Sequence, residues 1–108
     1  MKPHWFYILL SLSSSPRHGA AIHDDIRELS GGDVRLWPAT LYGSLEELTG
    51  RGWLEEVAAD ERPEGIAGRE RFYRLTPEGR GALEREVARL EWLADAARSR
   101  LEGRRAGA

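Results

Sequence analysis

The residues of this chain that are best suited to chemistry lie in one segment, from Pro38 to Leu48. The start of the segment combines small, hydroxyl-bearing and aromatic residues and holds no acid: Pro38, Ala39, Thr40, Tyr42, Gly43 and Ser44. Leu41, Leu45 and Leu48 recur at i, i+4 and i+7, which predicts a helix with an apolar stripe and these residues on its other side. Because the positive end of a helix dipole lies at its N-terminus, this end is suited to phosphate groups. The alternative is an ordinary amphipathic helix with a solvated outer face.

No catalytic or metal-binding set stands out elsewhere. His23, Asp24 and Asp25 are adjacent, so they point in different directions around a helix, and no second histidine follows at i+4. The run Ser11–Ser15 contains no nucleophile elbow, and the glycines form no phosphate-binding pattern. The chain has no cysteine, which excludes disulfides and thiolate metal sites. We therefore expect no enzyme activity, no cofactor and no metal.

The segments around this helix predict a winged helix-turn-helix. Residues 53–57 and 69–75 have the pattern of strands, and the stretch between them is rich in Asp, Glu, Pro and Gly, as in a loop. A hairpin beside a recognition helix can place arginines against the adjacent DNA backbone, here Arg69 and Arg71. The expected fold class is α+β and mostly α: a winged helix-turn-helix with a long C-terminal dimerisation helix.

Four short motifs carry a family resemblance. They are Pro16-Arg17-His18-Gly19, Pro38-Ala39-Thr40-Leu41-Tyr42, Gly52-Trp53-Leu54-Glu55 and Phe72-Tyr73-Arg74-Leu75-Thr76-Pro77-Glu78-Gly79. Together they resemble the PadR family of transcriptional regulators, over about residues 6 to 100. The short C-terminal part is similar to the subgroup that has one long terminal helix in place of a separate C-terminal domain. That family often has an aromatic residue after His-Gly and a basic residue after Leu-Tyr, where this chain has Ala20 and Gly43.

The resemblance implies a DNA-binding transcriptional regulator, and more specifically a cytoplasmic, homodimeric repressor that is relieved by a small aromatic or hydrophobic effector. The expected partner is double-stranded DNA with a pseudo-palindromic operator. The residues expected at the DNA are Pro38, Ala39, Thr40, Tyr42, Gly43 and Ser44 of the helix, Arg69 and Arg71 of the wing, and His18 of the preceding turn. The alternative is a winged-helix protein-interaction module without DNA binding. Sixteen basic and eighteen acidic residues favour this alternative, since DNA-binding domains are usually basic.

Length and composition indicate one globular domain. A chain of 108 residues is too short for two independent cores, and 41% hydrophobic and 31% charged residues are ordinary for a soluble protein. The apolar stretch Trp5–Leu12 is too short to span a membrane and lacks a cleavage site, so we expect a buried helix over residues 4–14 and no membrane association. A second helix is expected over residues 19–30. Residues 34–37 are expected to add an extended piece to the wing sheet.

The C-terminal region predicts a long helix. We expect the DNA-binding domain to comprise residues 1–76, and residues 77–108 to form a dimerisation helix to about residue 101 and a frayed tail. Thr76 is a suitable N-cap, and Pro77 suits the first helical position. Apolar residues then recur at spacings of 4, 3, 4, 3 and 4, a heptad seam that favours dimerisation: Leu83, Val87, Leu90, Ala94, Ala97 and Leu101. The alternative is that the seam packs on its own domain, chiefly on the first helix.

Trp92 lies off the strict seam in the middle of this helix. It either flanks the dimer core or forms the wall of an effector pocket. In the second case Ala96 leaves room beside the indole, and Trp5 and Phe6 of the first helix complete a flat apolar slot near the two-fold axis. Such a slot would suit a planar aromatic effector.

Overall fold

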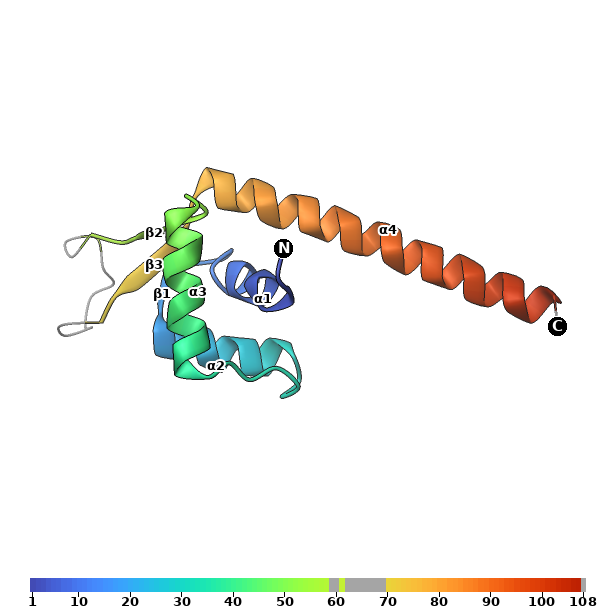
Figure 1. Cartoon of the computed structure of the whole chain (residues 1–108), viewed down its shortest axis with the longest axis horizontal. Coiled ribbons are helices and arrows are strands. Elements are labelled where there is room, and N and C mark those ends of the chain that lie inside the picture. Colours follow the sequence, from blue (N-terminus) through green and yellow to red (C-terminus); the bar gives the residue numbers. More distant parts are fainter. Residues whose placement is uncertain (59–60, 62–69, 108) are drawn as a thin grey trace.

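Three helices and a small sheet form a globule, and a fourth helix projects from it (Figure 1). The structure is a computed structural model. It describes the whole chain except residues 59–60, 62–69 and 108, and the side chains of residues 104–107. The elements are α1 (Pro3–Ser11), β1 (Arg17–His18), α2 (Gly19–Leu29), α3 (Pro38–Gly50), β2 (Leu54–Glu56), β3 (Phe72–Leu75) and α4 (Pro77–Gly107). The molecule is elongated, with extents of 62 × 27 × 23 Å.

The core lies where α1, α2 and α3 pack together. Its fully buried side chains come from the apolar stripes of these helices and from β2: Ile8, Leu9, Ile22, Ile26, Leu45, Leu48 and Leu54. The predicted apolar helix near the N-terminus is therefore a core helix, and it also contacts α4. None of the described helices combines the length and the hydropathy that a membrane span requires.

The sheet has three antiparallel strands in the order β1-β3-β2. The two strands expected for the wing are present, but the third comes from Arg17–His18 and not from residues 34–37. The expectation for residues 34–37 was wrong because other contacts hold this segment. The backbone N–H of Val34 donates to Ser30 Oγ at 2.9 Å, and Leu36 is buried in the core.

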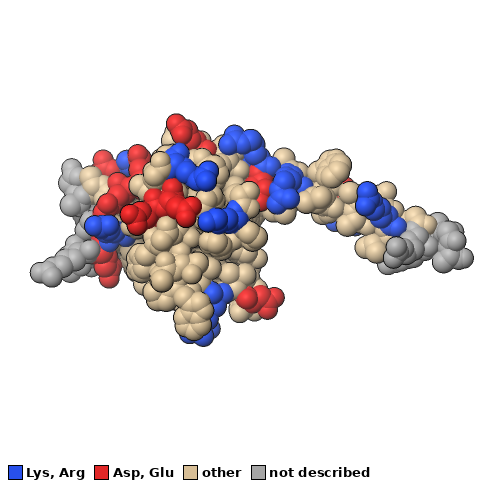
Figure 2. All heavy atoms as spheres, viewed as in Figure 1, with Lys and Arg blue, Asp and Glu red and all other residues tan. Residues whose placement is uncertain are grey.

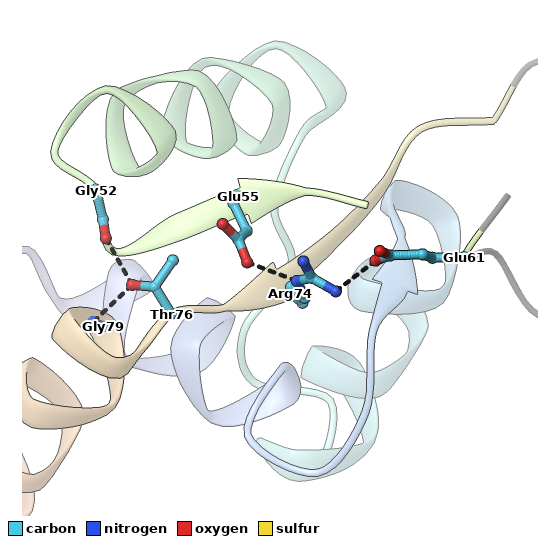
Figure 3. Close-up of polar contacts among 6 residues, drawn as sticks. All are labelled: Gly52, Glu55, Glu61, Arg74, Thr76 and Gly79. Carbon is cyan, nitrogen blue, oxygen red and sulfur yellow. Dashed lines mark hydrogen bonds and ion pairs between the residues drawn. The ribbon is translucent and has the colours of Figure 1, made fainter. Parts of the chain in front are cut away.

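Helix α4 begins as expected and ends later than expected. Its N-cap is Thr76, whose Oγ1 accepts a hydrogen bond from the backbone N–H of Gly79 at 3.0 Å. The same hydroxyl donates to the carbonyl oxygen of Gly52 at 2.6 Å, so the cap also joins α4 to the turn after α3 (Figure 3). The helix continues past residue 101 to Gly107. The fold is thus a winged helix-turn-helix with a long C-terminal helix, as the sequence predicts.

Candidate functional site

The outer face of α3 presents most of the residues expected at a phosphate-rich ligand. Pro38, Ala39, Thr40, Tyr42 and Gly43 are all exposed. The exception is Ser44, which is 5% exposed and whose Oγ lies 3.0 Å from His4 Nε2 of α1. Ser44 was predicted on the outer face, but its position beside Leu45 turns it toward α1, so it joins two helices and does not face solvent.

The ring of Tyr42 is held against the start of α2. A Cβ atom at Gly19 would lie 2.5 Å from the Tyr42 hydroxyl oxygen and 2.8 Å from its ring carbons, so a side chain there would require the ring to move. The Tyr42 side chain is still 53% exposed. Tyr42 therefore presents an aromatic ring and a hydroxyl group on the outer face of α3.

His18 has a structural role in the turn before α2. It is the N-cap of α2, and its Nδ1 accepts a hydrogen bond from the Ala21 backbone N–H at 3.3 Å. This bond leaves the proton on Nε2, which lies 3.7 Å from a carboxylate oxygen of Glu70. The imidazole ring packs edge-on against Phe72. His18 thus links α2 to the wing.

The two wing arginines that the structure describes, Arg71 and Arg74, are paired with carboxylates. Arg74 Nε donates to Glu55 Oε1 at 2.6 Å, and its Nη1 donates to Glu61 Oε2 at 2.8 Å (Figure 3). These bonds, first that to Glu55, raise the pKa of Arg74 above its usual value. Arg71 Nε lies 3.8 Å from Glu56 Oε1. Any anion that binds to these arginines must compete with the carboxylates.

Of the other wing arginines, Arg69, which was expected at the DNA, lies outside the described residues. Arg74 was not among the residues expected at the DNA, although it lies in the expected strand 69–75 beside Tyr73.

Charge is unevenly distributed along α3. Figure 2 shows acidic side chains gathered over the wing and around the C-terminal end of α3, whereas the surface toward the N-terminal end of α3 is mostly uncharged. A groove of about 290 Å³ separates α3 from the wing, lined by Tyr42, Glu46, Thr49, Glu56, Arg71 and Tyr73. The neutral N-terminal half of α3 is therefore the part of this face most suited to a polyanion.

The apolar seam of α4 is divided between the core and the solvent. Leu83 is 7% exposed and belongs to the core of its own domain, so it was wrongly expected at a partner. The later seam residues Val87, Leu90 and Leu101 are exposed, as is Leu93, which the seam did not include. Ala94 and Ala97 are also exposed.

The residues expected to form an effector slot are in different environments. Trp92 is 69% exposed and Ala96 lies nearby on the same helix, partly exposed. Phe6 is partly buried at the rim of the core. Trp5 is 3% exposed, with its ring edge-on to that of Trp53, so it is a core residue and cannot line a slot at the helix middle.

A groove of about 340 Å³ lies between α1 and α4. Apolar side chains from both helices dominate its lining, which is made by Met1, Pro3, Phe6, Tyr7, Glu86, Arg89 and Leu90. Glu86 is buried although it carries a charge, and Arg89 donates two hydrogen bonds to its carboxylate, at 2.6 and 2.9 Å. These bonds lower the pKa of Glu86. The two charged residues in this lining therefore form an ion pair with each other.

The comparison with known families decides the classification. The model of the transcriptional regulator PadR-like family matches residues 8–85, which run from α1 into the first turns of α4. The chain belongs to the PadR-like family. Its members are transcriptional regulators and not enzymes, in agreement with the resemblance of the four motifs.

Similar proteins include a curated relative and several solved structures. An uncharacterised 37.1 kDa protein of transposon TN4556 from Streptomyces fradiae is 41% identical over 80 residues, 74% of this chain. The matched part of this chain spans 21% of the length of that relative. A PadR family regulator from Clostridium difficile superposes with a TM-score of 0.74 at 23% identity, over 89% of this chain and 95% of that chain. PadR from Bacillus subtilis, in complex with operator DNA, superposes with a TM-score of 0.68 at 22% identity, over 81% and 47% of the two chains.

The PadR-like match also separates two parts of the candidate site. The exposed face of α3 and the wing lie inside the matched residues. Most of the exposed seam of α4, from Val87 to Leu101, lies beyond them. The exposed face of α3 and the wing are therefore part of what the family shares, whereas the distal part of α4 lies outside the match.

Proposed function

We propose that this chain is a homodimeric, DNA-binding transcriptional regulator that reads a pseudo-palindromic operator. The observation that carries the proposal is the exposed, uncharged N-terminal half of α3, flanked by a three-stranded wing. A helix of this kind fits the major groove, and its first backbone N–H groups can donate to phosphates. Further support comes from PadR of Bacillus subtilis, a protein of the same fold whose structure is a complex with operator DNA.

The DNA contacts follow from this placement. Thr40 and Tyr42 would meet base edges and phosphates from the outer face of α3, with Pro38, Ala39 and Gly43 allowing close approach. Arg71 would meet the neighbouring backbone once it leaves Glu56. Because Arg71 and Arg74 are paired with carboxylates, the affinity should be modest and strongly dependent on salt.

The direct experiment is a gel shift with the DNA upstream of the chain's own gene at two salt concentrations. The parent should bind more weakly at the higher salt concentration, and Tyr42→Ala should lose affinity while its circular dichroism stays that of the parent. Arg71→Ala should weaken binding to all sequences and reduce the salt slope by about one. If the parent binds no DNA, the alternative function, a winged-helix protein-interaction module, replaces this one.

Dimerisation is supported by the apolar surface that α4 leaves uncovered. Val87, Leu90, Leu93 and Leu101 are exposed along one helix that projects from the globule. Exposed apolar side chains that recur along one helix mark a candidate protein–protein interface. The groove between α1 and α4 can receive the α4 helix of a second copy, and its Glu86–Arg89 pair would leave no unpaired charge inside the interface.

We further propose that the regulator is a repressor and that a planar aromatic effector releases it. In a dimer whose two-fold axis passes near the middle of α4, the two Trp92 rings would lie close together, with Ala96 leaving room beside them. An effector stacked there would change the angle between the α4 helices and the spacing of the two α3 helices. It releases DNA if it binds the two spacings unequally.

Tryptophan fluorescence tests the effector site. Planar aromatic compounds should quench the parent and lower its affinity for DNA, and Trp92→Ala should lose both responses. Trp92→Phe, which keeps an aromatic face, is the matched control and should keep part of the effect on DNA affinity. An unchanged response in Trp92→Ala would assign Trp92 to the dimer core alone.

A further inference from the structure

The segment just before α3 carries a stacked pair of exposed side chains. Trp37 is 67% exposed, one of the most exposed large hydrophobic residues that the structure describes. The guanidinium of Arg35 lies 5.3 Å from the centre of the Trp37 ring, within the range of a cation–π contact. The pair offers a ligand both a flat stacking surface and a positive charge.

The fold fixes this pair relative to α3. Trp37 is the N-cap residue of α3, and its carbonyl oxygen accepts a hydrogen bond from the Leu41 backbone N–H at 2.9 Å. Leu36, between the two exposed residues, is buried in the core. The pair therefore stands at the N-terminal end of α3, next to the exposed Ala39 and Thr40, and cannot move far from it.

Arg35 differs from the described wing arginines in its ion pairing. Among the described residues, no carboxylate lies within salt-bridge distance of Arg35, whereas Arg71 and Arg74 of the wing are both paired with glutamates. Arg51, at the other end of α3, has its guanidinium over the rings of Trp5 and Trp53. Arg35 is thus a cation beside the neutral end of α3 that does not have to leave a carboxylate in order to bind an anion.

We propose that Arg35 and Trp37 form a contact to the sugar–phosphate backbone of DNA at the N-terminal end of α3. The inference rests on the proposed DNA-binding function and adds to it a contact outside helix and wing. The Arg35 guanidinium pairs with a phosphate through its N–H groups, while its face stays on the indole. The indole covers the adjacent deoxyribose, and the stacking holds the guanidinium in a preorganised orientation. Backbone contacts carry no sequence information, so the pair raises affinity for operator and non-operator DNA alike.

The test is fluorescence anisotropy with a labelled operator duplex and a scrambled duplex, at several salt concentrations. Arg35→Ala should weaken binding to both duplexes and reduce the salt slope by about one. Trp37→Ala should weaken both by about three- to tenfold, and Trp37→Phe should recover part of the loss. Arg100→Ala removes the same charge from the distal part of α4 and should bind as the parent does.

The outcomes separate this inference from the function on which it rests. A parent that binds neither duplex overturns both. If the parent binds and Tyr42→Ala weakens it, but the Arg35 and Trp37 variants keep its affinity and salt slope, the contact is absent and the proposed function stands. Loss confined to the operator would also overturn the inference, because it would indicate base recognition. Both positions are exposed, so circular dichroism of each variant should match that of the parent.

Discussion

At the scale of single residues, the place of a side chain around α3 decides whether it holds the helix or faces its ligand. Thr40 and Tyr42 point outward, whereas Ser44 meets His4 of α1 across the core edge. Helix α3 is thus joined to α1 by a polar contact in addition to its leucines. Gly19 adds a second constraint, because its missing Cβ makes the space in which the Tyr42 ring lies.

The contact between His4 and Ser44 predicts a pH dependence of stability. Burial lowers the pKa of His4 below its usual value, and the charge of Lys2 lowers it further, while Glu47 opposes the shift. The unfolded chain therefore binds a proton at His4 more readily than the folded chain does. This contribution to stability is complete above the unfolded pKa of histidine, about 6.5, and is lost as the pH falls below it.

Urea unfolding at pH 7.5 and 5.5 should show the loss in the parent, and His4→Gln should show a smaller one. An equal loss in both proteins would contradict the assignment to His4.

Gly43 is a position where substitutions should raise both the stability of the fold and its affinity for DNA. A Cβ at this position would meet nothing within 4 Å, and the residue lies on the exposed face of α3. Gly43→Ala should raise the free energy of unfolding by about 0.5–1 kcal/mol, because glycine is unfavourable inside a helix. Gly43→Arg should also raise affinity for DNA and increase the salt slope by about one, since it adds a cation on the proposed DNA-facing side of α3. Gly43→Ala is the control for the added charge. Thermal unfolding and anisotropy measure the two effects.

The sequence predicted the outer face of α3 with one error. A helical period of leucines fixes which side is buried, and it placed Thr40 and Tyr42 correctly in the exposed set. Ser44 lies beside the leucine stripe, and a small hydroxyl residue there has no pattern that distinguishes core from surface. The partner that buries it, His4, is forty positions away in the chain. Which wing arginines are paired with glutamates was likewise not encoded in any local spacing.

At the scale of elements, the junction between wing and α4 explains the motif from Tyr73 to Gly79. The Thr76 hydroxyl donates to Gly52 and accepts from Gly79, so one side chain ties the turn after α3 to the start of α4. The backbone N–H of Thr76 donates to the Trp53 carbonyl oxygen at 3.1 Å. Through these bonds the direction of α4 is coupled to the position of the recognition helix.

Gly79 is essential to this junction for a steric reason. A Cβ at Gly79 would overlap the carbonyl oxygen of Trp53, which is backbone and cannot turn away. Gly79→Ala should therefore lower the free energy of unfolding by about 1–3 kcal/mol, despite the better helix propensity of alanine. Gly81→Ala is the matched control. A Cβ there meets only the mobile end of Arg85 at 3.4 Å, so this variant should be neutral or more stable. Chemical denaturation compares the two, and equal stability of both variants would exclude the clash.

The elements themselves were predictable to different degrees. The ends of α2 and α3 were predicted closely, and the proline and threonine cap of α4 gave its start but not its end. The third strand was not, because Arg17–His18 is too short to carry a period of its own. It is a strand only through its antiparallel pairing with β3, and this pairing depends on the tertiary structure.

At the scale of the whole molecule, the projection of α4 is the feature that a single chain does not explain. The globule ends where α4 leaves α1, and the remaining turns carry leucines and Trp92 into solvent. The heptad spacing predicted this surface from the sequence. It left open which seam residues would pack on their own domain, because the spacing does not say where the globule ends, and Leu83 is one that does.

The last prediction concerns assembly. Leu90 is 40% exposed and lines the groove between α1 and α4, where the α4 helix of a second copy is proposed to pack. Leu90→Glu places a charge in that apolar interface, at a cost of several kcal/mol if the charge stays buried and unpaired. Since Leu90 is not part of the core cluster, the variant should keep the circular dichroism of the parent and run as a monomer in sedimentation. It should also lose operator binding, because a monomer cannot span two half-sites about 34 Å apart. A parent that sediments as a monomer at micromolar concentration would remove the proposed dimer, and the pseudo-palindromic operator with it.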